Sequence, residues 1–86
     1  MPKNRGKMNK EYRTTDFYLT AFLLAKDYQL KQTENHLGKL TFTINSDKDL
    51  EASIKDFYAG NALVNPLEYQ NQLRNLKSLI YAIKKS

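Results

Sequence analysis

The segment TTDFYLTAFLLAKDY, residues 14–28, constrains the fold more than any other part of this chain. Its apolar residues cover most of the circumference of a helix, and its leucines and alanines favour helix over strand. Thr14 or Thr15 can cap this helix, and Asp16 falls in its first turn, where the helix dipole favours an anion. A helix that is apolar nearly all round must be covered on several sides. The sequence therefore predicts a helix near residues 16–26 in the middle of the core.

The following segment changes to the two-residue period of a half-buried strand. Leu40, Phe42 and Ile44 alternate with polar residues, and residues 28–33 alternate in the same way. The sequence ENHLGK between these runs contains Asn and Gly, as hairpin loops do. We therefore expect a β-hairpin over residues 28–45.

A second helix is predicted after the hairpin, in the sequence NSDKDLEASIKDFYAGN. Ser46 can cap this helix, with Asp49 three residues later as the partner in a capping box. The apolar residues that follow share one helical face, and Gly60 is placed for a left-handed C-terminal cap.

The third predicted helix carries the most specific local signal in the chain. Asn65 caps it, Pro66 takes the first helical position, and Glu68 completes an N-x-x-E box. An apolar stripe follows at spacings of four and three residues, formed by Tyr69, Leu73, Leu76, Ile80 and Ile83. The stripe matches a heptad seam for only about two heptads, so we favour packing in the domain's own core over a dimer or partner seam.

The predicted elements follow the order α-β-β-α-α. In a chain of 86 residues they define one small α+β domain over residues 12–86, with the hairpin packed against three helices. Residues 1–11 have two methionines as their only large apolar residues, so we predict a flexible basic arm there. The residues expected to be mostly buried are Phe17, Leu23, Leu24, Phe42, Ile44, Leu50, Ile54, Phe57, Leu73, Leu76 and Ile80.

Positive charge gathers at both ends of the chain, although the net charge is only +5. A basic stripe on the third helix, which also includes Gln70, runs about 100° around the axis from the apolar stripe. Such a face can follow a phosphate backbone and offer a tyrosine ring for base stacking. The candidate nucleic-acid-binding residues on the arm and this helix are Lys3, Arg5, Lys7, Lys10, Arg13, Arg74, Lys77, Tyr81, Lys84 and Lys85. The competing explanation is a solvated face, with the last two lysines favoured by the helix dipole.

Nothing in the sequence indicates an enzyme. His36 is the only histidine and falls in the predicted hairpin loop, without a Ser or Cys nucleophile near it in sequence. The chain has no cysteine and its three glycines form no phosphate-binding loop, so we expect no metal or other cofactor. No apolar run approaches the roughly 20 residues that span a bilayer, and no signal peptide is recognisable. The expected location is the cytoplasm, with no membrane partner.

Two long segments resemble a known family. They are YRTTDFYLTAFLLAKDYQL and FYAGNALVNPLEYQNQLRNLKSLIY, and the resemblance runs from Tyr12 to Tyr81. The shared features are a polar-Thr-Asp-Phe-Tyr start, a turn with the pattern F-Y-x-G-x-A, and an R-x-x-K-S-L-I-Y end. Short bacterial and phage proteins described only as a domain of unknown function are similar to this pattern, although they often have Gly in place of Asp27. The resemblance implies a bacterial or phage origin and supplies no catalytic residues.

Two hypotheses from different classes remain open. The first is a non-enzymatic nucleic-acid-binding accessory protein, for DNA or RNA, that uses the basic helix and the arm without strong sequence preference. The second is a protein-interaction module, such as a homodimer or an inhibitor or adaptor of a larger protein, that uses exposed tyrosines and the apolar stripe. Salt distinguishes them, because phosphate contacts weaken steeply with ionic strength and apolar interfaces do not.

Overall fold

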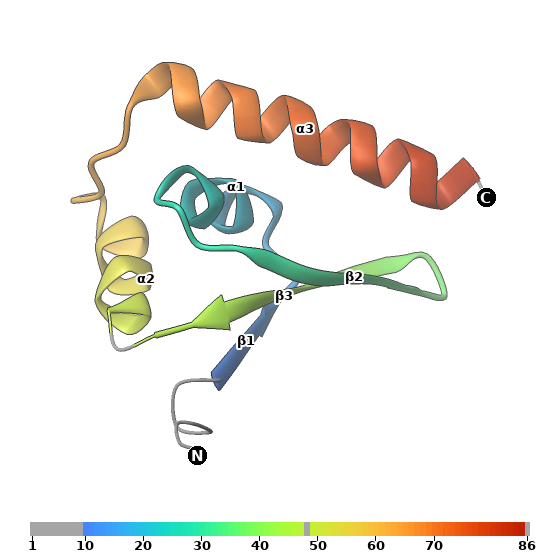
Figure 1. Cartoon of the computed structure of the whole chain (residues 1–86), viewed down its shortest axis with the longest axis horizontal. Helices are drawn as coiled ribbons and strands as arrows, with labels where there is room; N and C mark the ends of the chain where they lie inside the picture. The colour runs from blue at the N-terminus through green and yellow to red at the C-terminus, as the bar shows by residue number, and fades with distance from the viewer. Residues whose placement is uncertain (1–9, 48, 86) are drawn as a thin grey trace, which may run out of the picture.

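The computed structural model describes residues 10–47 and 49–85. In chain order, the elements are β1 (Lys10–Thr14), α1 (Phe17–Ala25), β2 (Leu30–His36), β3 (Lys39–Ser46), α2 (Leu50–Ala59) and α3 (Pro66–Lys85) (Figure 1). The α+β class and the predicted order of the three helices and the hairpin are confirmed. One strand, β1, precedes the elements that the sequence predicted.

The three described strands form one antiparallel sheet in the order β1-β3-β2, so β3 pairs on both sides. Tyr12 of β1 and Leu30 of β2 both lie opposite Ile44, and Thr14 of β1 lies opposite Phe42. The register between β2 and β3 shifts just after Leu30. The predicted hairpin over residues 28–45 is confirmed as β2 and β3, joined by a two-residue turn.

Strand β1 corrects the predicted boundary of the N-terminal arm. Lys10 and Glu11 lie opposite Ser46 and Asn45, so these two residues belong to the sheet and not to a flexible arm. The sequence KEYRT gives little warning of this, because five residues with one aromatic side chain show too short an alternation to read as a strand. The remainder of the predicted arm, residues 1–9, lies outside the described part of the chain.

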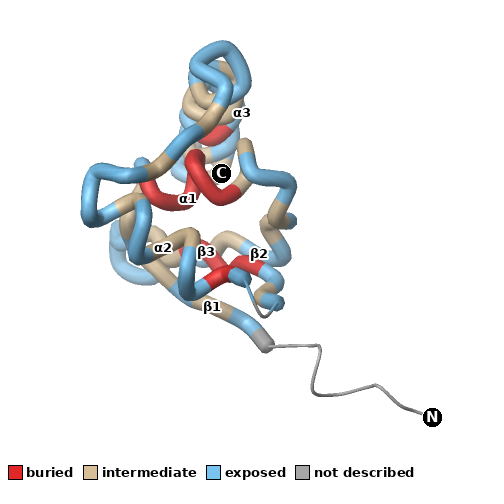
Figure 2. Tube along the Cα trace, turned by 90° about the vertical axis from the view of Figure 1, so that its left-hand side faces the viewer, coloured by how far each residue is buried: buried red, intermediate tan, exposed pale blue. Residues whose placement is uncertain are grey.

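Helix α1 is the central layer of the molecule. Figure 2 shows its buried segment between the sheet and α3, and five consecutive residues, 19–23, are buried. This confirms the prediction from the all-round apolar pattern. The predicted cap was wrong: Asp16 is the N-cap, and its Oδ1 accepts a hydrogen bond from the Leu19 N–H at 3.0 Å. Thr14 instead accepts a hydrogen bond from the N–H of Asp16, which leaves the capping position to Asp16.

The core has two parts that meet on α1. One joins α1 to α2 and the sheet around Phe22, and the other joins α1 to α3 and the hairpin around Leu76. Of the residues predicted to be mostly buried, the buried ones are Leu23, Phe42, Ile44, Leu50 and Leu76. The half-buried ones, which pack against the two clusters, are Phe17, Leu24, Ile54, Phe57, Leu73 and Ile80. The prediction missed Leu19 and Phe22, which are also buried.

The start of α2 differs from the prediction and its end agrees. Ser46 is the last residue of β3, so it cannot cap the helix, and Asp49 occupies the N-cap without a side-chain hydrogen bond. Asp47 organises this turn instead, since its Oδ1 accepts a hydrogen bond from the Asp49 N–H at 2.9 Å. Gly60 ends the helix with a φ of 80°, the left-handed cap that the sequence predicted.

Helix α3 begins as predicted. Asn65 Oδ1 accepts hydrogen bonds from the N–H groups of Leu67 at 2.9 Å and Glu68 at 3.1 Å. Pro66 follows as the first helical residue, where its missing N–H has no helical partner to lose. The helix then runs for 20 residues across the top of α1 (Figure 1).

Candidate nucleic-acid interface

The apolar stripe of α3 faces the body of the protein. Tyr69, Leu73 and Ile80 pack against the cluster that contains Leu76, and Leu76 itself is only 2% exposed. Interior packing, which the length of the stripe favoured, is therefore confirmed. Because one side of α3 is used in this way, the opposite side faces solvent along the length of the helix (Figures 1 and 2).

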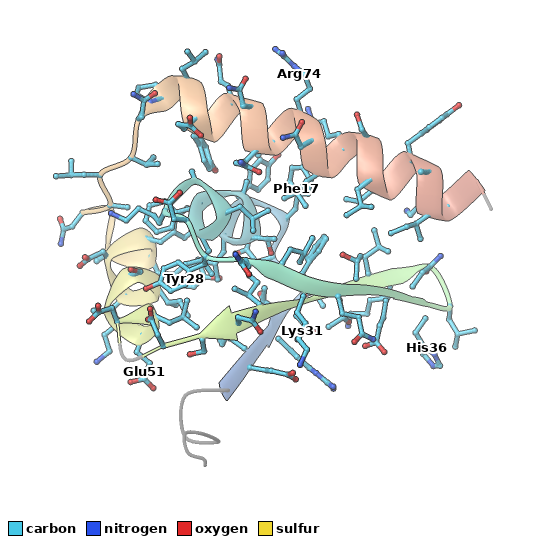
Figure 3. The ribbon with its side chains drawn as sticks, viewed as in Figure 1. Phe17, Tyr28, Lys31, His36, Glu51 and Arg74 are labelled. Atoms are coloured by element: carbon cyan, nitrogen blue, oxygen red, sulfur yellow. The ribbon has the colours of Figure 1, made fainter. Side chains whose placement is uncertain are left out.

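Four predicted site residues share an exposed side of α3, and we call this set the basic face: Arg74, Lys77, Tyr81 and Lys84. At 100° per residue they fall within an arc of about 80°. Figure 3 shows Arg74 projecting from α3 away from α1. Lys85 is the last residue of the helix, and its side chain lies outside the described part of the structure.

The cations of the basic face are not offset by ion pairs in the part of the chain that the structure describes. No acidic residue follows Glu68 in the sequence. Within the described residues, the one ion pair joins Lys31 to Glu11 on the sheet, and none involves Arg74, Lys77 or Lys84. An anion that approaches α3 therefore meets cations that are not already paired with carboxylates.

The structure separates the basic face from the basic residues of the N-terminal segment. Arg13 lies in β1 opposite Thr43, whose neighbours Phe42 and Ile44 belong to the core. Since successive strand residues point to opposite faces, Arg13 lies on the side of the sheet away from α1 and α3. Lys10 begins the same strand, and its side chain lies outside the described part of the structure. Lys3, Arg5 and Lys7 lie outside the described residues altogether.

The outer face of the sheet, on the side away from α1 and α3, carries one ion pair. Lys31 of β2 and Glu11 of β1 form an ion pair, and this hydrogen bond lowers the pKa of the Glu11 carboxyl. Figure 3 shows Lys31 on the side of the sheet away from α3. Thr43 lies on β3, between β1 and β2, and is buried. Its hydroxyl has no hydrogen-bond partner among the described residues. One cation of this face is therefore already paired with a carboxylate in the described structure, whereas those of the basic face are not.

A tyrosine–aspartate contact joins the start of α1 to the end of α2. The Tyr58 hydroxyl donates a hydrogen bond to Asp16 Oδ2 at 2.6 Å, which raises the pKa of Tyr58 to about 12. Burial opposes ionisation of Asp16, but the hydrogen bonds from Tyr58 and from the Leu19 N–H outweigh it and lower the pKa of the carboxyl. Nearby, the Tyr69 hydroxyl donates to the Tyr18 carbonyl at 3.4 Å. The sequence shows no sign of this cluster, because its residues come from three elements and share no spacing.

Two further observations concern metal binding and membrane spanning. Among residues 10–47 and 49–85, no group of three or more His, Asp or Glu side chains is arranged to hold a metal ion. In the same part of the chain, no helix combines the length and the apolar character needed to cross a bilayer.

Fold and surface together define a small α+β domain with a cationic helix laid across its core helix. A family model described as "Domain of unknown function (DUF5659)" matches residues 9–82. The chain belongs to this family, which confirms the resemblance to a domain of unknown function. No curated protein and no solved structure matches the chain.

Proposed function

We propose that this protein is a small, non-enzymatic nucleic-acid-binding accessory protein that binds through the basic face of α3. The observation that carries the proposal is the exposure of Arg74, Lys77 and Lys84 on one side of the helix, without ion pairs in the described structure. A cytoplasmic location in a bacterial or phage system, as the sequence led us to expect, is part of the same proposal.

The dimensions of α3 suit a phosphate backbone. Arg74 and Lys84 are ten residues apart, which corresponds to about 15 Å along the helix axis. A helix with one free side fits the major groove of duplex DNA, where cations contact the flanking phosphates. Tyr81 is 67% exposed on the same side, so its ring is also available to stack on an unpaired base.

The basic residues before α1 have a secondary role in this proposal. Arg13 lies on the opposite side of the molecule from the basic face, so the two sets do not form one continuous surface. We infer that Lys3, Arg5, Lys7, Lys10 and Arg13 add general electrostatic attraction. The basic face makes the close contacts.

The test is fluorescence anisotropy with short single- and double-stranded DNA and RNA at several salt concentrations. Changing both Arg74 and Lys77 to Ala should weaken binding about equally for all sequences and flatten the salt dependence by roughly one to two units of slope. The single variant Lys77→Ala should also weaken binding. Its matched control is Lys55→Ala, at an exposed lysine on α2, which should change the affinity less. Absence of binding at micromolar protein in low salt, with the fold intact, would refute the proposal.

The protein-interaction hypothesis retains one specific observation in its favour. The apolar stripe of α3 packs against α1 and the hairpin, so it is not a free dimer seam. Tyr18 and Tyr58 remain 59% and 61% exposed, respectively, and tyrosine is common at protein interfaces. Binding that survives high salt, and that Tyr18→Ala weakens while Lys77→Ala does not, would favour this function instead.

A further inference from the structure

The turn at the tip of the β2–β3 hairpin holds a residue that does not suit its backbone. Leu37 has a φ of 55° and Gly38 a φ of 84°. Positive φ at both central residues is typical of a mirror-image turn, where Asn-Gly or Gly-Gly is preferred. Asn35 Oδ1 supports the turn by accepting a hydrogen bond from the Gly38 N–H at 3.1 Å. A bulky residue with positive φ is an outlier that calls for an explanation beyond the turn itself.

Packing does not explain Leu37 either. Its side chain is 94% exposed, more than the 83% of Leu63 on the connector between α2 and α3. Single exposed leucines are common on protein surfaces, but one that also holds an unfavourable backbone conformation points to a contact outside the chain.

The surroundings of Leu37 indicate what that contact is. His36 and Lys39 flank the two-residue turn, and both are exposed. Leu40 and Ile80 pack against the same core cluster, so the outer half of the hairpin lies beside the C-terminal part of α3 (Figure 1). Lys84 lies about one turn beyond Ile80. The apolar tip is therefore at the same end of the molecule as the last lysine of the basic face.

We propose that Leu37 is an apolar wedge that enters between base pairs of duplex DNA held on the basic face. This inference rests on the proposed nucleic-acid function and narrows it to a duplex that can be locally unstacked. Side chains such as Leu enter between base steps from the groove and kink the duplex, while neighbouring cations neutralise the phosphates. Lys39 supplies such a cation beside the tip, and Lys84 supplies another at the same end of the molecule.

A lipid surface fits the same tip less well. Interfacial binding strengthens with the apolar area that enters the lipid, and stable attachment needs more than one weak apolar anchor. The described strand residues before the tip are polar, from Gln32 to His36, and include Glu34. A single leucine above such strands offers little area to a membrane but enough to separate two stacked base pairs.

The experiment uses the full chain and a duplex with 2-aminopurine at a central pyrimidine–purine step, where unstacking is easiest. Fluorescence of 2-aminopurine rises when the base loses its stacking neighbour. The variant Leu37→Asn suits the left-handed turn, so it should fold at least as well as the natural protein. Leu37→Met keeps an apolar wedge, and Leu63→Asn is the matched control at another exposed leucine.

The wild-type protein, Leu37→Met and Leu63→Asn should each raise the fluorescence, and Leu37→Asn should lose more than about half of the rise. If Leu37→Asn and wild type bind and behave alike, the wedge is refuted while the proposed function stands. If the wild-type protein does not bind the duplex, the wedge is refuted, and the proposed function falls with it only when the single-stranded DNA and the RNA probes show no binding either. If it shows no fluorescence rise but binds anionic phospholipid vesicles in a Leu37-dependent way, the tip is a membrane contact and the wedge is also refuted.

Discussion

Asp16 shows how one side chain can do two structural tasks. One carboxylate oxygen caps α1 through the Leu19 N–H, and the other accepts the hydroxyl proton of Tyr58 from the end of α2. The two elements are 42 residues apart at this contact, so the bond closes a long segment of chain. Thr14 supports the arrangement by accepting a hydrogen bond from the N–H of Asp16.

Replacing Tyr58 by Phe should remove this contact while keeping the ring. Because Tyr58 is 61% exposed, water replaces part of the lost bond, and we expect a loss of about 0.5–1 kcal/mol in the free energy of unfolding. The measurement is chemical denaturation at neutral pH. Tyr12→Phe is the matched control, since no hydrogen bond of its hydroxyl is described, and an equal loss in both variants would contradict the assigned contact.

The same pair predicts the direction of two pH effects. The pKa of Tyr58 is raised from 10.0 to about 12, so its stabilising effect should be complete below pH 10 and should disappear as the pH rises through about 12. The pKa of Asp16 is lowered, so its contribution is present above 3.8 and is lost as the pH falls through the lower, folded value. The difference in tyrosinate absorbance between wild type and Tyr58→Phe should show a midpoint near 12. A midpoint near 10 would show that the hydroxyl is not bound to the carboxylate.

At the scale of elements, local chemistry was readable in the sequence and long-range pairing was not. Asn65 and Gly60 act within one turn of their own helix, and both were predicted correctly. Strand β1 pairs with a segment about thirty residues later, so its short alternating pattern has meaning only beside β3. Ser46 looked like a helix cap because the sequence does not show that the sheet extends to this residue.

The same contrast between local pattern and long-range pairing applies to the residues of the candidate interface. Helical periodicity predicted that Arg74, Lys77 and Lys84 share a side, and the structure shows them exposed on α3. The position of Arg13 on the opposite face of the molecule depends on the pairing of β1 with β3, which periodicity cannot supply. The exposed Leu37 was equally hidden, because its significance depends on the backbone angle of the turn.

Helix α3 supplies a prediction about packing at this scale. Leu76 is 2% exposed, whereas Leu79, one turn further on, is 36% exposed. Leu76→Ala should lower the free energy of unfolding by about 2–5 kcal/mol, because it leaves a cavity against α1 and the sheet. Leu79→Ala is the matched control and should cost clearly less. A melting curve unchanged by Leu76→Ala would show that α3 is not part of the core.

For the whole molecule, the decisive feature is that both core clusters share α1. The cluster that includes residues of α2 contains Leu19, Phe22 and Leu23 of α1. The cluster that includes residues of α3 contains Ala21 of α1. Neither side can separate without uncovering apolar surface of the central helix, so we expect the two sides to unfold together. This also means that α3 presents its basic face from a fixed position.

This arrangement predicts one cooperative transition. Leu50→Ala, on the α2 side, and Leu76→Ala, on the α3 side, should each shift the denaturation midpoint. In both variants, the curves from far-ultraviolet circular dichroism and from tyrosine fluorescence should coincide, because both core clusters are lost when α1 is released. A separate early loss of helicity in Leu76→Ala alone would contradict this, since it would mean that α3 detaches while α1, α2 and the sheet remain folded. In that case the cationic helix would be a movable arm rather than a fixed surface, and its position relative to the hairpin would no longer be fixed.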